Sequence, residues 1–304
     1  RNKNETMQSL FASIFTEPTG SYRSYVKQQL ADEFLLMKQT RMSSFLLGIC
    51  PLALYVHNIA HNYAYYLMIE KKVYKQPVLV DMGYDLANPW FNYDVLRNLP
   101  FFFALFVGVL TLLQPLLPSH WLHNPAYYNN KRLFIVEMVS KCCFTYSIGV
   151  ALRVCSFLGT LLPSPAAHCR LVSEGGTLNP NQPIIASVPD IFTTFDTEHG
   201  CGDLIFSGHT LFFLIAVLVT LSYLRVRYVQ RAGQLLLLCV CLPLFVAATV
   251  ATSRHYTVDV LVALFVTTML WLQSHHWVTF DIDECKEHTS DRDTLHLIAF
   301  HQQV

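Results

Sequence analysis

Six long apolar stretches constrain this chain more than any other feature. Each holds about 20 residues, the length at which an α-helix crosses the hydrocarbon core of a bilayer. The stretches lie at 43–67, 98–117, 133–154, 205–224, 234–252 and 257–274. The sequence therefore predicts an all-α fold: a polytopic membrane protein with six transmembrane helices.

The composition agrees with this prediction. The chain has 304 residues, of which 53% are hydrophobic and only 14% are charged, whereas a soluble domain carries about a quarter charged residues. Basic and acidic residues are equal in number, at 21 each, so the net charge is zero and nothing favours a nucleic-acid partner. The length would allow two soluble domains, but the apolar stretches exclude them.

The apolar stretches divide the chain into three parts. Residues 1–42 are predicted to be a cytosolic segment, either an amphipathic helix on the membrane surface or a helix packed on the bundle. Residues 43–275 form the predicted six-span membrane domain, and 276–304 a cytosolic tail. Within the domain, the Pro- and Gly-rich segment 163–200 is predicted to be a lid or a binding loop.

The distribution of Lys and Arg predicts the orientation. With a cytosolic N-terminus, thirteen lie on the cytosolic side: Arg1, Lys3, Arg23, Lys27, Lys38, Arg41, Lys131, Arg132, Arg225, Arg227, Arg231, Lys286 and Arg292. Six lie on the other side: Lys71, Lys72, Lys75, Arg97, Arg170 and Arg254. Both termini are therefore expected in the cytosol, and the outer loops in the lumen or outside the cell.

Two histidine motifs open toward that outer side. One, at residues 201–210, reads Cys-Gly-Asp-Leu-Ile-Phe-Ser-Gly-His-Thr and contains His209; the other reads Ser-Arg-His-Tyr-Thr-Val-Asp and contains His255 and Asp259. The second histidine and the acid are four residues apart, so on a helix they share one face. Two histidines and a carboxylate supply the nucleophile, the orienting group and the proton shuttle of covalent phosphoryl transfer. A His/Asp pair that only caps a helix is the alternative.

Other polar residues are candidates for supporting roles. Ser207 offers a hydroxyl beside the imidazole, Asp203 falls at the loop edge, and Tyr256 follows the second histidine. Arg153 is expected about 30 Å across the bilayer at the outer interface, where its guanidinium would bind a head-group phosphate; a snorkelling arginine is the alternative. Glu137 either pairs with Lys141 or faces the cavity. The first stretch is the weakest span, since it is interrupted by His57, Asn58, His61 and Asn62.

The nine cysteines show no metal-binding spacing, and no metal site is predicted. Cys169 and Cys201 bracket the long outer loop in a compartment that permits disulfides. Whether these two pair is left open by the sequence.

The motifs resemble those of the sphingomyelin synthase and sphingolipid synthase family, within the lipid phosphate phosphatase group. Residues 201–210 resemble the third motif of that family, 255–260 the fourth, 152–169 the second and, more loosely, 78–84 the first. The resemblance implies a six-span lipid phosphate phosphatase-like core with a lumenal site, in the Golgi, the endoplasmic reticulum or the plasma membrane. The Lys…Arg-Pro motif of the phosphatases is absent, which disfavours a plain lipid phosphatase.

The resemblance further implies head-group exchange. A glycerophospholipid donor would pass its phospho-head group to ceramide and release diacylglycerol. All three partners would be membrane lipids. His255 would attack phosphorus, Asp259 would orient it, His209 would act as acid and then base, and Arg153 would bind phosphate; no cofactor or metal is implied. The residues of the motifs slightly favour an inositol head group over choline or ethanolamine. Whether the protein forms homo-oligomers stays open.

Two other classes of protein stay open beside the transferase. A lipid phosphatase or phospholipase C-like hydrolase would use the same three residues with water as the acceptor. A non-catalytic membrane transporter would use the histidines for binding alone.

Overall fold

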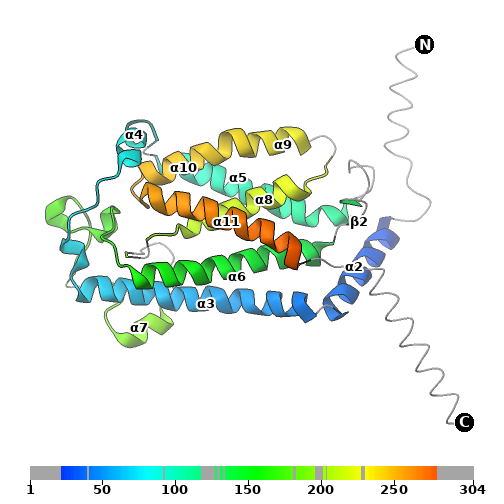
Figure 1. Ribbon diagram of the computed structural model, residues 1–304, viewed down its shortest axis with the longest axis horizontal. Helices are drawn as coiled ribbons and strands as arrows, with labels where there is room; N and C mark the ends of the chain where they lie inside the picture. Colours follow the sequence, from blue (N-terminus) through cyan, green and yellow to red (C-terminus); the bar gives the residue numbers. More distant parts are fainter. Residues whose placement is uncertain are drawn as a thin grey trace, which may run out of the picture.

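The computed structural model describes residues 22–39, 41–91, 93–117, 127–128, 131–132, 134–180, 183–195, 201–202, 204–226 and 230–278. They form a bundle of long helices that run roughly along its long axis (Figure 1). Five are long and apolar enough to cross a membrane: α3 (Arg41–Glu70), α5 (Asp94–Leu113) with η2 (Gln114–Leu116), α6 (Ile135–Gly159), α9 (Gln230–Leu236) continued by the π turn η6 (Leu237–Cys241) and α10 (Leu242–Ala251), and α11 (Thr257–Trp277). The all-α prediction is confirmed, and the chain is an integral membrane protein. The strands β1 (Tyr127–Tyr128) and β2 (Lys131–Arg132) are only two residues long.

The predicted count of six spans is not confirmed, because the stretch at 205–224 forms a shorter helix. This helix, α8 (Gly208–Tyr223), has 16 residues, or about 24 Å at 1.5 Å per residue. It packs against α5, α6 and α11. An apolar helix enclosed by three others is buried on most of its circumference, so its composition is explained by protein packing as much as by lipid.

Two predicted boundaries need correction. The third span was expected to end at residue 154, but α6 continues to Gly159. Arg153 therefore lies within the helix, with 4% of its surface exposed, rather than at its end. The first span, expected at 43–67, runs from Arg41 to Glu70. The helix therefore tolerates the polar residues that interrupt its sequence.

Those polar residues of α3 hold a short helix against it. Asn62 donates to the carbonyl oxygens of Ile191 at 2.9 Å and Thr194 at 2.8 Å, and Asn58 donates to Thr194 at 2.8 Å. These carbonyls belong to the end of α7 (Val188–Thr193), where an isolated helix leaves acceptors without partners. The two amides of α3 therefore position α7 on the outside of the bundle (Figure 1).

The N-terminal helix α2 (Tyr22–Gln39) contacts α3, α6 and η2. The Glu33 carboxylate accepts from the backbone N–H groups of Ile135 at 2.6 Å and Val136 at 2.9 Å. An anion at the first turn of a helix satisfies free N–H groups and meets the positive end of the helix dipole. Residues 1–21 and 279–304 lie outside the described residues, and so do most of the predicted tail and half of the predicted N-terminal segment.

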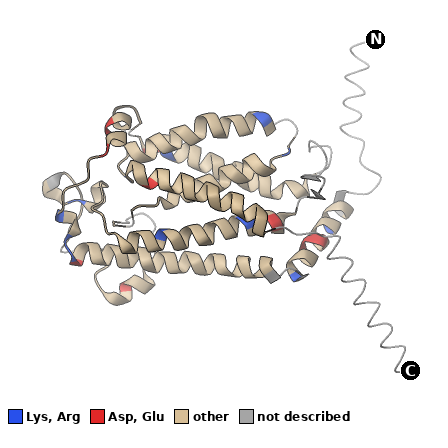
Figure 2. Cartoon of the chain, in the orientation of Figure 1, with Lys and Arg blue, Asp and Glu red and all other residues tan. Residues whose placement is uncertain are grey.

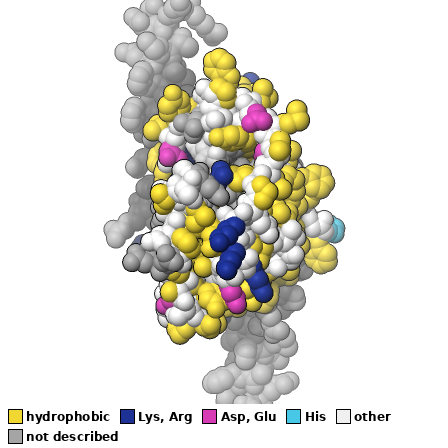
Figure 3. Space-filling model, turned by 90° about the vertical axis from the view of Figure 1, so that its left-hand side faces the viewer, with side chains coloured by type: hydrophobic (Ala, Val, Ile, Leu, Met, Phe, Trp, Pro, Cys, Tyr) yellow, Lys and Arg dark blue, Asp and Glu magenta, His cyan; other side chains and the backbone are white. Residues whose placement is uncertain are grey.

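The connections at the far end of α3 and α6 are short turns and helices. They comprise η1 (Val73–Lys75), α4 (Met82–Phe91), η4 (Ala167–Cys169), η5 (Val172–Glu174) and α7. A disulfide joins Cys169 to Cys201. Charged side chains are sparse along the long helices (Figure 2), while this end displays a row of Lys and Arg side chains among hydrophobic ones (Figure 3).

Candidate active site

The second histidine motif places His255 directly before α11, with Asp259 in its first turn. The Nδ1 atom of His255 lies 3.4 Å from Oδ2 of Asp259. The histidine is 7% exposed and the aspartate is fully buried. The distance is longer than a good N–H···O bond, but catalytic hydrogen bonds often shorten only when substrate is bound. The carboxylate therefore stands behind the imidazole and faces Nδ1, which leaves Nε2 for a reaction.

Backbone hydrogen bonds fix the Asp259 carboxylate. Oδ1 accepts from the N–H of Ile205 at 2.8 Å, and Oδ2 accepts from the N–H of Tyr256 at 2.9 Å. Its backbone oxygen accepts from the N–H of Ser207 at 3.2 Å. Ile205 adopts a left-handed conformation, with φ 72°, that a β-branched residue rarely adopts. Asp259 thus caps α11, as the alternative interpretation expected, and also joins the two histidine motifs.

His209 lies in the first turn of α8, and its side chain is exposed. Ser207 is the N-cap of this helix: its Oγ accepts from the N–H of Thr210 at 3.3 Å, the usual capping role of a serine hydroxyl. The ring centroids of His209 and His255 are 6.4 Å apart. Attack on phosphorus needs about 3–3.5 Å, and proton transfer to an oxygen about 3 Å. The two rings are therefore close enough to act on one phosphate group.

Arg153 lies beneath the turn that carries His209. Its Nη1 donates to the backbone oxygen of Phe206 at 2.6 Å, and its Nε donates to Nε2 of His57 at 3.0 Å. A Cβ added to Gly208 would lie 3.0 Å from Nη1, so the glycine is needed for this close approach. Phe157 packs against the guanidinium at 5.6 Å from its ring centroid. The interior position excludes the snorkelling alternative, and His57 is a contact that the sequence did not reveal.

Three polar cavities meet at residues 253–255. One, of about 260 Å³, is lined by Asp94, Arg97, Asn98, His209 and Arg254. A second, of about 240 Å³, shares Asp94 and Arg254 with the first and adds His168. A third, of about 360 Å³, contains His255 together with Asp81, Asp85 and Arg170. Ser253 has a left-handed conformation, with φ 53°, and directly precedes Arg254 and His255. Arg254 lines the first and second cavities, whereas His255 lines the third.

Arg97 and Arg254 were missed as site residues by sequence reasoning. Both were counted only as charges of the outer loops, although Arg254 directly precedes His255. Arg97 comes from the first turn of α5, where it contacts Asp94 at 3.6 Å and Asn98 at 3.1 Å. Together these arginines bring two positive charges to the cavity that contains His209. Guanidinium groups match the oxygens of a phosphate.

A segment before α4 closes over the start of α11. Both oxygens of Asp81 accept from Thr257, Oδ2 from its N–H and Oδ1 from its hydroxyl, each at 2.6 Å. Burial raises the pKa of the Asp81 carboxyl, but hydrogen bonds from Thr257, Tyr84 and Gly83 outweigh burial and hold that pKa below its ordinary value.

Tyr256 connects the same region to the end of α6. Its hydroxyl donates to the backbone oxygen of Pro163 at 2.6 Å and accepts from the N–H of Leu79 at 3.2 Å. Burial is the main cause that raises the pKa of Tyr256, with a contribution from the nearby Asp259. The tyrosine is therefore a neutral structural link beside His255.

Two of the predicted supporting residues do not enter the site that the structure describes. Glu137 contacts Lys141 at 2.7 Å near the opposite end of α6, where the ammonium also donates to the Tyr223 hydroxyl at 2.9 Å. It is a structural ion pair rather than a cavity residue. Asp203 lies outside the described residues.

One group of potential metal ligands occurs among the described residues. His168, Cys169 and Cys201 place their ligand atoms within 4.8 Å of one another. The disulfide uses both sulfur atoms, however, and a disulfide cannot supply the thiolates that bind a metal. The arrangement therefore fits a covalent cross-link.

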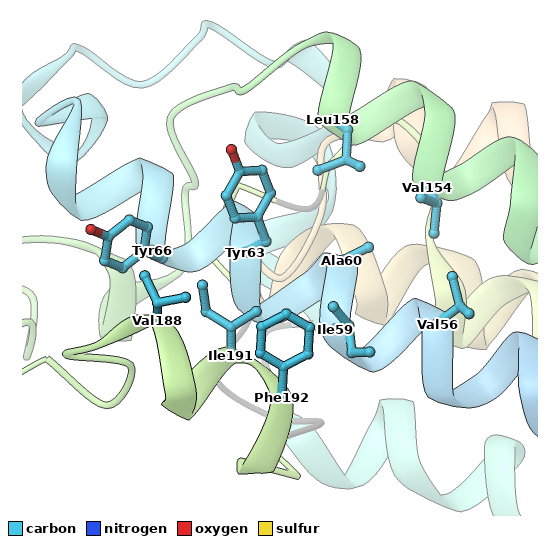
Figure 4. A pocket seen from close by; sticks show the side chains of 10 residues that line it. All are labelled: Val56, Ile59, Ala60, Tyr63, Tyr66, Val154, Leu158, Val188, Ile191 and Phe192. Carbon is cyan, nitrogen blue, oxygen red and sulfur yellow. The ribbon is translucent and has the colours of Figure 1, made fainter.

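An apolar groove of about 380 Å³ lies on the outside of α3, between α6 and α7 (Figure 4). Aliphatic and aromatic side chains line it, including Ile59, Ala60, Val154, Leu158, Ile191 and Phe192. Such a lining suits hydrocarbon chains rather than a polar head group. The lining of this groove includes none of the residues that line the three polar cavities.

Comparison with known proteins agrees with this geometry. Residues 200–276, which contain both histidine motifs, match the family model described as PAP2 superfamily C-terminal. This match and the relatives below confirm the resemblance predicted from the motifs.

The relatives carry names from sphingolipid chemistry. A phosphatidylinositol:ceramide inositolphosphotransferase of Oryza sativa subsp. indica is 28% identical over 219 residues, which cover 71% of this chain and 60% of the relative. Phosphatidylinositol:ceramide inositolphosphotransferase 3 of Arabidopsis thaliana is 26% identical over 216 residues, covering 71% and 68%. Sphingomyelin synthase-related protein 1 of Mus musculus is 30% identical over 139 residues, covering 40% and 28%. The chain thus spans about 60% of the length of the rice relative.

Proposed function

We propose that this chain is a sphingolipid synthase that transfers phosphoinositol from phosphatidylinositol to the primary hydroxyl of ceramide and releases diacylglycerol. The observation that carries the proposal is the facing pair His209 and His255, with Asp259 behind the second ring. The inositol head group is favoured because the plant relatives are named for it.

The first half-reaction forms a covalent intermediate. Nε2 of His255 attacks the donor phosphorus, and the bond between phosphorus and the diacylglycerol oxygen breaks. His209 gives its proton to that oxygen, so diacylglycerol leaves as a neutral alcohol. Asp259 stabilises the positive charge that develops on His255.

The second half-reaction is the reverse of the first with a new alcohol. His209 removes the proton from the primary hydroxyl of ceramide, the ceramide oxygen attacks phosphorus, and the bond to His255 breaks. One histidine serves as acid and then as base because the departing and the arriving groups are both primary alcohols of a lipid. Arg97 and Arg254 line the cavity beside His209 and neutralise the phosphate oxygens. Arg153 adds a further positive charge beneath the turn that carries His209.

Several features of the protein in the cell belong to the same proposal. The site opens to the lumen or the exterior of a Golgi, endoplasmic reticulum or plasma membrane, and both termini are cytosolic. Residues 43–275 form the catalytic membrane domain, and the loop at 163–200 limits the entry of water. Assembly into homo-oligomers is compatible with the chemistry.

The experiment that tests the proposal uses purified protein in proteoliposomes with labelled ceramide. Vesicles contain phosphatidylinositol, phosphatidylcholine or phosphatidylethanolamine, and wild type is compared with His255→Ala. A new phosphosphingolipid from one donor, together with equimolar diacylglycerol, supports the transferase when the variant forms neither. Glu137→Gln is the matched control, since its ion pair lies near the opposite end of α6.

A hydrolase is the competing function, because water can replace ceramide in the second half-reaction. Diacylglycerol release at an equal rate with and without ceramide, with no sphingolipid product, would establish it. Lipid movement that persists in His255→Ala would instead indicate a transporter.

A further inference from the structure

The cavity that contains His255 has no role yet in the proposed reaction. It measures about 360 Å³, within the range of about 300–1,000 Å³ for small-molecule sites. Its walls come from residues 78–85 before and within α4, from the loop near Arg170, and from residues 253–256. His255 therefore lines a partly open cavity that is distinct from the cavity of His209.

The chemistry of the proposed transfer decides which part of the donor occupies this space. The head group stays bonded to phosphorus in both half-reactions, while phosphorus is bonded in turn to a lipid oxygen, to His255, and to a lipid oxygen again. The lipid oxygens must lie near His209, which exchanges protons with them. In an in-line displacement the head group is equatorial, between the two histidines, and the side of His209 is taken by the lipid oxygens. The cavity that His255 lines is therefore the space for the head group.

The polar side chains of the cavity fall into two groups. Asp81 and Tyr256 direct their oxygens to Thr257, Leu79 and Pro163, so they build the frame. A second group consists of the Asp85 carboxylate, the Arg170 guanidinium, and the hydroxyls of Tyr84 and Ser253. Together they provide both hydrogen-bond acceptors and donors.

A polyol satisfies such a mixed set, because each hydroxyl both donates and accepts. A trimethylammonium group cannot form hydrogen bonds and prefers several open aromatic faces. Among the described residues that line the cavity, the aromatic rings are Tyr84 and Tyr256, and Tyr256 is only 3% exposed. The cavity therefore lacks the surroundings that a choline head group requires.

We infer that this cavity is the head-group site of the donor lipid and that Asp85 and Arg170 select a hydroxyl-rich head group over a quaternary ammonium. This inference rests on the proposed transferase function. A site that hydrogen-bonds substrate hydroxyls discriminates strongly against analogues without them, since its polar groups then lose their partners. Asp85 and Arg170 thus determine specificity, while the two histidines determine the reaction.

Competition between donors in one vesicle tests the inference. Proteoliposomes contain labelled ceramide with equal amounts of phosphatidylinositol, phosphatidylcholine and phosphatidylethanolamine, and the ratio of the three products is measured. Wild type should form the inositol product predominantly. Asp85→Ala and Arg170→Ala should lower kcat/KM for phosphatidylinositol by about 10- to 100-fold, and change the rates with the other donors by less than about 3-fold.

Conservative variants and matched controls separate selectivity from folding. Asp85→Asn and Arg170→Lys keep the shape of the cavity and should shift the product ratio in the same direction by a smaller factor. Glu70→Ala and Lys71→Ala remove exposed charges at the end of α3 and should leave the ratio unchanged.

The contrary outcomes are distinct. If Asp85→Ala and Arg170→Ala lower kcat/KM equally for all donors, or for none of them, the head-group site is overturned and the proposed transferase function is not. Preference of the wild type for phosphatidylcholine, lost in Asp85→Ala, overturns the assignment to a polyol. Diacylglycerol release by the wild type without any ceramide product overturns the transferase itself, and the inference with it.

Discussion

Asp81 accepts hydrogen bonds from Thr257 through both of its carboxylate oxygens, although the two residues are 176 positions apart in the sequence. Thr257 is the first residue of α11 and lies two residues after His255. The same carboxylate accepts from the N–H of Gly83 at 2.9 Å and so also caps α4. One side chain thus anchors the start of two helices, and the motif at 78–84 is fixed to the motif that contains His255.

Gly83 makes this contact sterically demanding. A Cβ at this position would overlap the hydroxyl of Thr257, whereas a Cβ at Gly48 in α3 would meet no atom within 4 Å. Gly83→Ala should destabilise the protein by about 1–3 kcal/mol, since the close contact must open, while Gly48→Ala should change stability by less than about 1 kcal/mol. Thermal unfolding in detergent measures both. Equal melting temperatures for the two variants would contradict the contact.

Asp81 also predicts a dependence of stability on pH. Its pKa is lowered in the folded state, so it binds protons less readily than in the unfolded chain, where the pKa is about 3.9. Its contribution to stability is present above about pH 3.9 and is lost as the pH falls through the folded pKa.

The difference in melting temperature between wild type and Asp81→Asn should therefore be constant from about pH 5 to about pH 7, which is roughly one unit or more above the pKa of the unfolded chain. The difference should shrink below about pH 4. Glu70→Gln, at an exposed position, serves as the control. A difference that grows as the pH falls would contradict the lowered pKa.

The two histidines should respond differently to the leaving group. His209→Ala should reduce transfer by about 10²- to 10⁴-fold with a natural donor, because the diacylglycerol oxygen must leave without a proton. A donor with nitrophenol in place of diacylglycerol needs no acid, so it should restore the covalent intermediate in His209→Ala but not in His255→Ala. Acid-labile labelling of the protein by a head-group-labelled donor measures the intermediate. Restored labelling in His255→Ala would exclude that residue as the nucleophile.

Arg153 and Arg254 should affect different kinetic constants. Arg153→Lys loses the bonds to Phe206 and His57 that hold the turn before His209. Misplacing a catalytic group by about 1 Å costs about 100-fold, so kcat should fall by about 10- to 100-fold with little change in KM. Arg254→Lys, in the cavity of His209, should mainly raise KM for the donor. A raised KM in Arg153→Lys would show that this arginine contacts the phosphate directly.

The disulfide between Cys169 and Cys201 closes a loop with a sequence separation of 32. Cross-linking a loop of this size stabilises a protein by about 3–4 kcal/mol through the entropy of the unfolded chain. Cys169→Ser and Cys201→Ser should each lower the melting temperature and abolish the mobility shift that reduction causes in the wild type. Cys155→Ser, an exposed free cysteine, should do neither. A wild type without a shift on reduction would contradict the bond.

The short-range features of the site were predictable from the sequence. His255 and Asp259 are four residues apart at the start of a helix, and Ser207, Gly208 and His209 begin another. A separation of four residues brings His255 near Asp259, although His255 precedes α11 instead of sharing a face of that helix. The two motifs therefore pointed to the candidate residues, but local spacing did not bring the motifs together. Apolar length likewise predicted the long helices, since it reflects the thickness of the bilayer.

Other roles of single residues were not accessible in this way. Asn58 and Asn62 looked like defects in a span, but they hold the end of α7. Arg153 was predicted near a helix end and lies inside a longer helix, bonded to His57. Glu137 belongs to a distant ion pair. Each role depends on which helix packs alongside, and apolar periodicity does not specify that neighbour.

The sequence by itself determined the membrane-embedded helices, the two histidine motifs and the class of chemistry that they support, because these depend on composition and on spacings of a few residues. Only the tertiary structure decided that Asp81 meets Thr257, that Arg153 lies beneath Phe206, and that His209 and His255 open into different cavities. Those relationships join residues that are 46 to 176 positions apart, and they arise from helix packing and hydrogen bonds that no local pattern encodes.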